Sequence, residues 1–206
     1  MNSTLEKSVF FKTSDGVDLE GAFFKGSDNA AVIAHPHPLY GGNMENMVVR
    51  ELAAIYQARR WSTLRFNFRG AGKSGGTYDE GKKEQQDVRA AVKYMQDSGA
   101  LRVDLAGYSF GAWVLAHTDT SDLAEGSIIM ISPPAAMMDF SQAPPCSRLK
   151  LAVTGSEDAI APPGTVRKVL ARLNPGADLR VIKGADHFFS NRAAELKSVM
   201  DEFLLI

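Results

Sequence analysis

An alternation of short apolar segments with longer amphipathic ones runs through most of the sequence and leaves few possible architectures. After residue 29, apolar segments rich in β-branched residues alternate with segments whose apolar residues recur three and four positions apart. The first pattern predicts buried strands and the second predicts helices. Because such an alternation builds βαβ crossovers, we expect a mostly parallel α/β sheet with helices on both faces.

The expected elements follow one another without a break. A hairpin is expected from strands at 8–13 and 18–24 around the turn Ser14-Asp15-Gly16. Further strands are expected over 30–35, 62–68, 101–109, 126–132, 148–155 and 177–184. Helices are expected over 45–60, 82–99, 110–118, 164–174 and 191–206. Since no repeat or linker divides this series, residues 1–206 are expected to form a single domain.

Composition and charge exclude several classes of protein. The 23 basic and 24 acidic residues give a net charge of −1, without the basic excess of a nucleic-acid-binding protein. The single cysteine, Cys146, cannot form an internal disulfide and indicates a reducing compartment. Residues 1–16 lack the pattern of a signal peptide, and no apolar run reaches the roughly 18 residues of a membrane span. We therefore expect a cytoplasmic protein with no nucleic-acid or membrane partner.

Polar and glycine-rich loops follow five of the expected strands. Their sequences are HPHPLYGG, RGAGKSGG, GYSFG, GSED and GADH, at residues 35–42, 69–76, 107–111, 155–158 and 184–187. Because ligands bind outside the carboxyl ends of the strands in open sheets of this kind, these loops are expected to meet at one edge. Three of the loops carry a serine, an aspartate and a histidine, in that chain order.

The loop Gly107-Tyr108-Ser109-Phe110-Gly111 places a serine between an expected strand and an expected helix. A serine on such a sharp turn takes an unfavourable backbone conformation, and flanking glycines let strand and helix approach without a Cβ clash. The following helix directs free N–H groups and the positive end of its dipole at the place where an oxyanion forms in acyl transfer. We therefore interpret the loop as a nucleophile elbow and Ser109 as the nucleophile.

Four motifs together resemble those of small bacterial α/β-hydrolases. They are HPHP-x-x-GG at 35–42, NFRGAGKS at 67–74, GYSFG at 107–111 and GADHFF at 184–189. The resemblance covers nearly the whole chain and implies the α/β-hydrolase fold with a Ser-acid-His triad, but it says little about the substrate. The chain is also more distantly similar to dienelactone hydrolases, which carry a cysteine at the elbow where this chain has Ser109.

Each residue of the expected triad has a role. His187 is expected to act as the general base that takes the Ser109 proton and returns it to the leaving group. Asp158, which matches the family motif, is expected to orient the imidazole and to stabilise its charged form. Glu157 and Asp186 remain alternatives, although Asp186 is adjacent to the base in sequence and would have difficulty in reaching its ring nitrogen. This chemistry needs no metal and no cofactor.

An oxyanion hole needs two backbone donors. The first is expected to be the N–H of Phe110, directly after the nucleophile. The second is expected in the loop after the strand at 30–35, where Pro36 and Pro38 have no N–H to donate. His37 and Leu39 are therefore the candidates, and the register of the loop in this fold favours His37.

The side chains of the HPHP segment allow two further interpretations. Because His35 and His37 are two positions apart, they point to one side of an extended segment, as metal ligands do. A metal site needs further ligands, however, and the available ones belong to the triad. The preferred interpretation is that His35 bonds the loop at 69–76. Arg69 is likewise expected to brace this loop, with a contact to the substrate as the alternative. The loop lacks the spacing of a phosphate-binding P-loop.

The segment between the strands at 126–132 and 148–155 is too short for a lid. A helical cap needs several elements to bury a core, whereas residues 133–147 provide about one turn of helix and a loop. We therefore expect no cap domain and an open substrate groove. Its walls are expected to include Tyr40, Met137, Met138 and Phe140, although these side chains suit a core equally well.

The combined expectation is a serine hydrolase that cleaves a small ester or thioester through an acyl-enzyme. Its partner would be a small-molecule acyl substrate, and the sequence does not define an oligomeric state. A small-peptide amidase or peptidase is the alternative within enzymes. A silent member of the fold that binds a ligand or partner is the alternative of another class.

Overall fold

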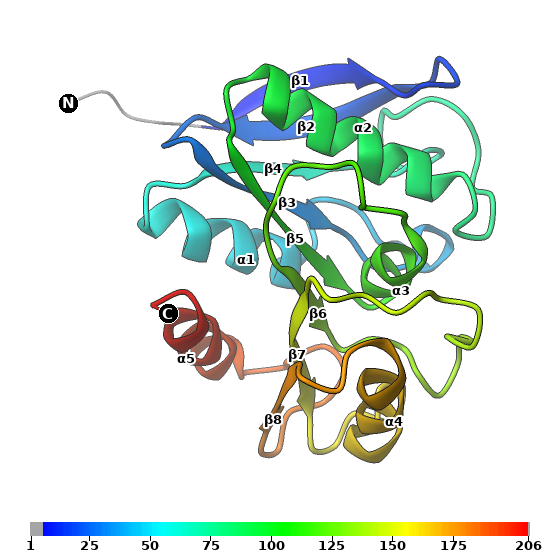
Figure 1. Cartoon of the computed structure of the whole chain (residues 1–206), viewed down its shortest axis with the longest axis vertical. Helices are drawn as coiled ribbons and strands as arrows, with labels where there is room; N and C mark the ends of the chain where they lie inside the picture. The colour runs from blue at the N-terminus through cyan, green and yellow to red at the C-terminus, as the bar shows by residue number, and fades with distance from the viewer. Residues whose placement is uncertain (1–5, 206) are drawn as a thin grey trace.

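The computed structural model describes residues 6–205, which form a sheet of eight strands with helices on both faces (Figure 1). The strands are β1 (Lys7–Lys12), β2 (Asp18–Phe24), β3 (Asn29–Ala34), β4 (Ser62–Phe66), β5 (Arg102–Tyr108), β6 (Ile128–Ile131), β7 (Leu149–Gly155) and β8 (Asp178–Ile182). Their order across the sheet is β1-β2-β4-β3-β5-β6-β7-β8. The pairs β1–β2 and β2–β4 are antiparallel and all others are parallel. The predicted hairpin and mostly parallel sheet are confirmed.

Helices cover the two faces of this sheet in separate groups. On one face lie α1 (Met47–Ala58) and α5 (Ala193–Phe203), and on the other lie α2 (Glu84–Asp97), α3 (Phe110–His117) and α4 (Pro163–Leu173) (Figure 1). All were predicted to within a few residues, and position 206 of the last predicted helix lies outside the described residues. A short 3-10 helix, η1 (Pro38–Tyr40), was not predicted. None of the helices within residues 6–205 is long and apolar enough to cross a membrane.

The central strands are apolar on both sides because both sides are covered. Ala30, Val32 and Ala34 of β3 join the core under α2, α3 and α4, whereas Ala31 and Ile33 join the core under α1 and α5. Successive side chains of a strand point to opposite faces, so two cores require an unbroken apolar segment. This explains why the strand sequences are continuous apolar runs rather than alternating ones.

The segment between β6 and β7 contains no regular element. Residues 132–148 form turns and bends only. The described part of the chain therefore carries no cap domain over the carboxyl edge of the sheet, in agreement with the prediction.

Candidate active site

Ser109 lies between the end of β5 and the start of α3, in a strained conformation. Its backbone has φ 52° and ψ −116°, a combination outside the regions that side-chain-bearing residues favour. The two flanking glycines permit this turn. A Cβ on Gly107 would lie 2.6 Å from the backbone nitrogen of Ala112, and one on Gly111 would lie 2.5 Å from the carbonyl oxygen of Ala34. Any larger residue at either position would separate the strands and helix that hold the serine.

The structure brings three of the predicted site residues into one hydrogen-bonded chain. Nε2 of His187 lies 3.0 Å from Oγ of Ser109, and Nδ1 of the same ring lies 2.9 Å and 3.0 Å from the two carboxylate oxygens of Asp158. All three side chains are buried. When Nδ1 donates its hydrogen to the carboxylate, Nε2 is free to accept the serine proton. The arrangement therefore has the geometry of a general base between a nucleophile and an orienting acid.

Asp158 is held ready in its ionised form. Its Oδ1 also accepts hydrogen bonds from the backbone N–H groups of Ile160, at 2.9 Å, and Ala161, at 2.7 Å. Burial acts to raise the pKa of this carboxyl, but the hydrogen bonds from His187 and Ala161 outweigh it and lower the pKa below its ordinary value. The charge that would stabilise an imidazolium is therefore present at neutral pH.

The two alternative acids do not contact the ring nitrogens of the histidine. Glu157 is exposed. Asp186 lies within the same loop as the histidine, and its Oδ1 accepts the backbone N–H groups of Phe188, at 3.1 Å, and Ser190, at 2.9 Å. Asp186 therefore shapes the loop, while Asp158 faces the ring.

The residue before the serine fixes the histidine loop, a contact that sequence reasoning missed. The hydroxyl of Tyr108 donates to the backbone carbonyl of His187 at 2.9 Å, and both groups are buried. Tyr108 is the last residue of β5, and Ser109 follows it directly in the turn. The elbow thus positions both the serine and, through its tyrosine, the histidine.

A small apolar cavity of about 270 Å³ opens beside the serine. It is lined by residues of the loops that follow β3, β5, β6, β7 and β8, which end at the same edge because the strands are parallel. The lining residues are Pro36, His37, Tyr40, Gly41, Gly42, Asn46, Tyr108, Ser109, Phe110, Pro134, Met137, Met138, Ile160, His187 and Phe188. The loop at 69–76, which was expected to meet the others here, is not among them.

The predicted oxyanion donors differ in position. Phe110 is the first residue of α3, so its N–H has no partner within the helix. It lines the cavity together with His37, and the centroids of the two side-chain rings are 4.9 Å apart. Leu39 does not line the cavity, and its side chain is exposed. The geometry therefore favours His37 over Leu39 as the second donor.

Phe140 is wrongly predicted as a wall of the groove. Its side chain is buried in the core against α3 and α4 and does not line the cavity. The physical reason is that Arg172 of α4 donates to the carbonyl of Phe140 and to that of Ala143, which turns this segment toward the helix. Met137 and Met138, which precede it, reach the cavity instead.

The His37 side chain is held from behind the cavity. Its Nε2 lies 3.0 Å from the hydroxyl of Tyr78, and its ring packs against Tyr40, Tyr78 and Phe110. Its Nδ1 is buried without a hydrogen-bond partner among residues 6–205. Burial lowers the pKa of His37, which favours a neutral ring. Tyr78, in the loop after β4, was not singled out from the sequence.

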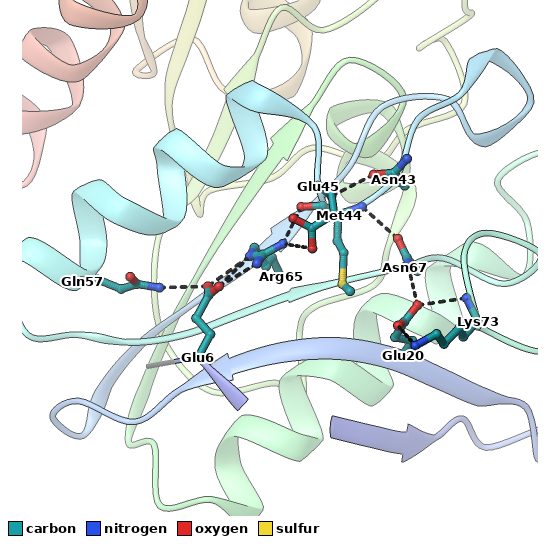
Figure 2. Close-up of polar contacts among 9 residues, drawn as sticks. All are labelled: Glu6, Glu20, Asn43, Met44, Glu45, Gln57, Arg65, Asn67 and Lys73. Atoms are coloured by element: carbon teal, nitrogen blue, oxygen red, sulfur yellow. Dashed lines mark hydrogen bonds and ion pairs between the residues drawn. The ribbon is translucent and has the colours of Figure 1, made fainter. Parts of the chain in front are cut away.

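A polar network outside the cavity anchors the loop between β3 and α1, which carries His37, at the end near α1. Figure 2 shows the backbone of Met44 bonded on both sides, with its N–H donating to Oδ1 of Asn67 at 2.8 Å and its carbonyl accepting from Arg65 at 3.0 Å. Nδ2 of Asn67 donates in turn to Glu20 of β2 at 2.8 Å, and Arg65 pairs with Glu6. The loop that carries His37 is therefore tied to β4 and β2.

His35 has a structural role, but its partner is Phe68, directly before the loop at 69–76 that was expected to receive the bond. Its Nε2 accepts the N–H of Phe68 at 3.0 Å, and its Nδ1 donates to the carbonyl of Pro36 at 2.6 Å. Both ring nitrogens are therefore occupied by protein groups. Complete burial lowers the pKa of His35 to about 4. Among residues 6–205, no group of three or more potential ligand side chains is arranged to hold a metal ion.

Arg69 is a buried brace rather than a substrate contact. Its guanidinium bonds Asp87 of α2, at 2.6 Å and 2.9 Å, and Asp15 of the first hairpin turn, at 2.9 Å and 3.2 Å. These pairs tie the glycine-rich loop to two distant elements. The side chain does not line the cavity.

Comparison with known proteins gives the class. No family model matches the sequence. An uncharacterized protein of Rickettsia prowazekii is 33% identical over 210 residues, which cover 96% of this chain and 88% of that protein. A solved α/β serine hydrolase homologue from Coxiella burnetii is 30% identical, with a TM-score of 0.88 over 96% of this chain and 97% of that one. A solved α/β serine hydrolase without a lid from Xanthomonas campestris is 28% identical, with a TM-score of 0.86 over 98% and 94% of the two chains.

The chain belongs to the α/β-hydrolase family. Within the family it is similar to the serine hydrolases that lack a lid, which agrees with the short β6–β7 segment. The more distant similarity to dienelactone hydrolases stays a prediction.

Proposed function

We propose that the protein is a serine hydrolase that cleaves a small, uncharged ester or thioester through an acyl-enzyme. The observation that carries the proposal is the chain of contacts from Ser109 through His187 to Asp158, on the surface of a small apolar cavity. The strained elbow supports it, because strain of this kind persists where the surrounding structure requires the conformation.

The contacts fit a two-step acyl transfer. Oγ of Ser109 attacks the acyl carbon while His187 takes its proton, and Asp158 stabilises the imidazolium. The negatively charged oxygen of the tetrahedral intermediate accepts hydrogen bonds from the backbone N–H groups of Phe110 and His37. The intermediate then expels the alcohol or thiol, which takes the proton from His187. Water attacks the acyl-enzyme in the same way and releases the acid.

The lining of the cavity supports an uncharged substrate. None of its residues is lysine or arginine, so a carboxylate or phosphate on the substrate would lose its hydration without gaining a cationic partner. The volume of about 270 Å³ lies just below the roughly 300–1,000 Å³ of cavities that enclose drug-sized ligands. We therefore expect the enclosed acyl group to be short, about two to six carbons, because further methylenes would lie outside the enclosed volume and be less completely buried.

Activity and labelling of the purified protein test the proposal together. The wild type should hydrolyse one or more members of a panel of esters, thioesters and aminoacyl amides, and a fluorophosphonate should label it. Ser109→Ala should abolish labelling and lower kcat by about 10⁴- to 10⁶-fold. Ser121→Ala, at an exposed loop serine, is the matched control and should keep both.

Three results would count against the proposal. Labelling of Ser109→Ala, or a tenth of wild-type turnover in that variant, would mean that another residue is the nucleophile. Turnover confined to the amides would favour a peptidase. A folded wild type that neither turns over the panel nor reacts with the probe would be a binding member of the fold.

A further inference from the structure

Exposed apolar side chains gather at the mouth of the cavity. Tyr40, Met137 and Phe188 each line the cavity, yet they are 82%, 66% and 62% exposed. Leu39, beside Tyr40 in η1, is 67% exposed. We call these four residues the apolar rim. Side chains that line a cavity and still face solvent extend its apolar surface outward.

The rim is assembled from three loops that are distant in sequence. Its members follow β3, β6 and β8, and only the parallel arrangement of these strands brings them to one edge. Other large exposed apolar residues of the described chain, such as Phe10 on β1 and Leu101 before β5, lie on separate elements. Scattered apolar residues are normal on a protein surface, whereas a group around a binding site indicates an apolar ligand.

The charges beside the rim restrict what that ligand can be. The segments that carry it, residues 36–47, 133–142 and 184–190, contain no lysine or arginine, and each contains one acidic residue, namely Glu45, Asp139 or Asp186. Surfaces that bind anionic lipids are rich in basic residues, and anionic ligands need such residues as well. The rim therefore fits an uncharged apolar group.

The order of the chemical steps assigns this group to one side of the scissile bond. The acyl group stays bonded to Ser109 until water attacks, so it must fit inside the small cavity. The alcohol or thiol leaves first, and it can leave without obstruction only through the open side. We propose that the apolar rim binds the alcohol or thiol portion of an uncharged ester or thioester, and that this portion is larger and more apolar than the acyl group. This proposal rests on the proposed serine hydrolase function.

Two series of esters test the assignment, each used below the concentration at which it forms micelles. One series keeps a butanoyl group and lengthens the alcohol from methyl to octyl, and the other keeps methanol and lengthens the acyl group. In the wild type, kcat/KM should rise along the alcohol series and level off along the acyl series. In Met137→Ser, the octyl-to-methyl ratio of kcat/KM should fall on the order of tenfold, because apolar contact is lost.

Matched variants separate this effect from a general disturbance. Met137→Leu keeps an apolar side chain and should restore most of the ratio. Leu101→Ser removes another exposed apolar residue, away from the cavity, and should leave the ratio unchanged. Leu39→Ser should lower the ratio as Met137→Ser does, although Leu39 does not line the cavity.

Binding of 1-octanol gives a readout that does not depend on turnover. In calorimetry, 1-octanol should bind Ser109→Ala and should bind Ser109→Ala/Met137→Ser several-fold more weakly. If Met137→Ser weakens octanol binding but the wild type turns over no ester, the rim is an apolar binding surface and the hydrolase function is rejected.

Four results would overturn the proposal while the hydrolase function stands. The first is an unchanged octyl-to-methyl ratio of kcat/KM in both Met137→Ser and Leu39→Ser, and the second is an effect of these variants on the acyl series instead of the alcohol series. The third is a rate that rises only above the micelle concentration, which indicates that the rim binds a lipid surface. The fourth is self-association of the wild type that Met137→Ser abolishes, which indicates that the rim binds a second copy of the chain.

Discussion

The hydroxyl of Tyr78 lies 3.0 Å from Nε2 of His37 and links two loops that follow neighbouring strands. His37 is the proposed second oxyanion donor through its backbone, while Tyr78 belongs to the glycine-rich region after β4, which does not line the cavity. The contact fixes the ring of His37, and thereby its backbone, from outside the reacting groups. We therefore propose that Tyr78 is a positioning residue.

Removing this hydroxyl should lower kcat and leave KM nearly unchanged. A neutral hydrogen bond contributes about 0.5–1.5 kcal/mol, so Tyr78→Phe should lower kcat by roughly two- to tenfold. The reason is that an oxyanion donor acts on the transition state more than on the bound ester. Steady-state kinetics on one short ester provide the measurement, with Tyr94→Phe on α2 as the control. A rise in KM at constant kcat would assign Tyr78 to substrate binding instead.

The acid of the triad can be assigned by comparing two neighbouring carboxylates. Asp158→Asn should lower kcat by about 10⁴-fold, because an amide in that position favours the wrong tautomer of His187. Glu157→Gln, one position earlier and exposed, should change kcat by less than about twofold. Both variants should retain the wild-type circular dichroism spectrum. If Glu157→Gln proves the damaging change, the loop rearranges in solution and the acid is misassigned.

The oxyanion role of His37 can be tested through its backbone. Its φ of −57° is a value that proline adopts, so His37→Pro deletes the N–H and keeps this torsion angle. That variant should lower kcat by about 10²- to 10³-fold. His37→Ala keeps the N–H but loses the contact with Tyr78, and it should resemble Tyr78→Phe. Equal losses in the alanine and proline variants would show that the side chain matters and the N–H does not.

His35 makes the stability of the fold depend on pH. Burial lowers its pKa from the ordinary 6.5 to about 4, so the unfolded chain takes up a proton between these values and the folded chain does not. This contribution to stability is complete above pH 6.5 and is lost as the pH falls toward 4. Between pH 7 and pH 5 the wild type should lose about 2 kcal/mol of unfolding free energy through this residue.

The matched variant for this effect is His35→Gln, which can still accept the N–H of Phe68 but does not titrate. Urea unfolding at pH 7 and at pH 5 measures the loss in each protein. The variant should lose about 2 kcal/mol less than the wild type over this interval. If both proteins lose the same amount, His35 is already protonated in the folded state or takes no part in the pH response.

Most of the fold could be predicted because it follows from local patterns. The apolar runs, the turn at Ser14-Asp15-Gly16 and the glycines around Ser109 act through the backbone preferences of neighbouring residues, so they can be read from one sequence. The end of β4 was placed too late, at Phe68 instead of Phe66. Asn67 and Phe68 form hydrogen bonds there with Met44 and His35, which lie in a distant loop, and no local sequence pattern predicts such partners.

In the candidate site, too, local features could be predicted from the sequence and long-range contacts could not. The elbow, the histidine and the exclusion of Pro36 and Pro38 as donors follow from residue type and spacing. Residue type and spacing favoured Asp158 over its neighbours but could not show its contact with His187. That contact depends on the pairing of β7 with β8, which brings Asp158 and His187 together although they are 29 positions apart in sequence.

Other features could not be decided from residue type and spacing. The contact of Tyr78 with His37 spans 41 positions, Phe140 turned inward toward α4, and Met137 turned outward to the rim. Local preferences determine which elements form. Which side chains meet, and which face water, depends on long-range packing that several competing neighbours decide together.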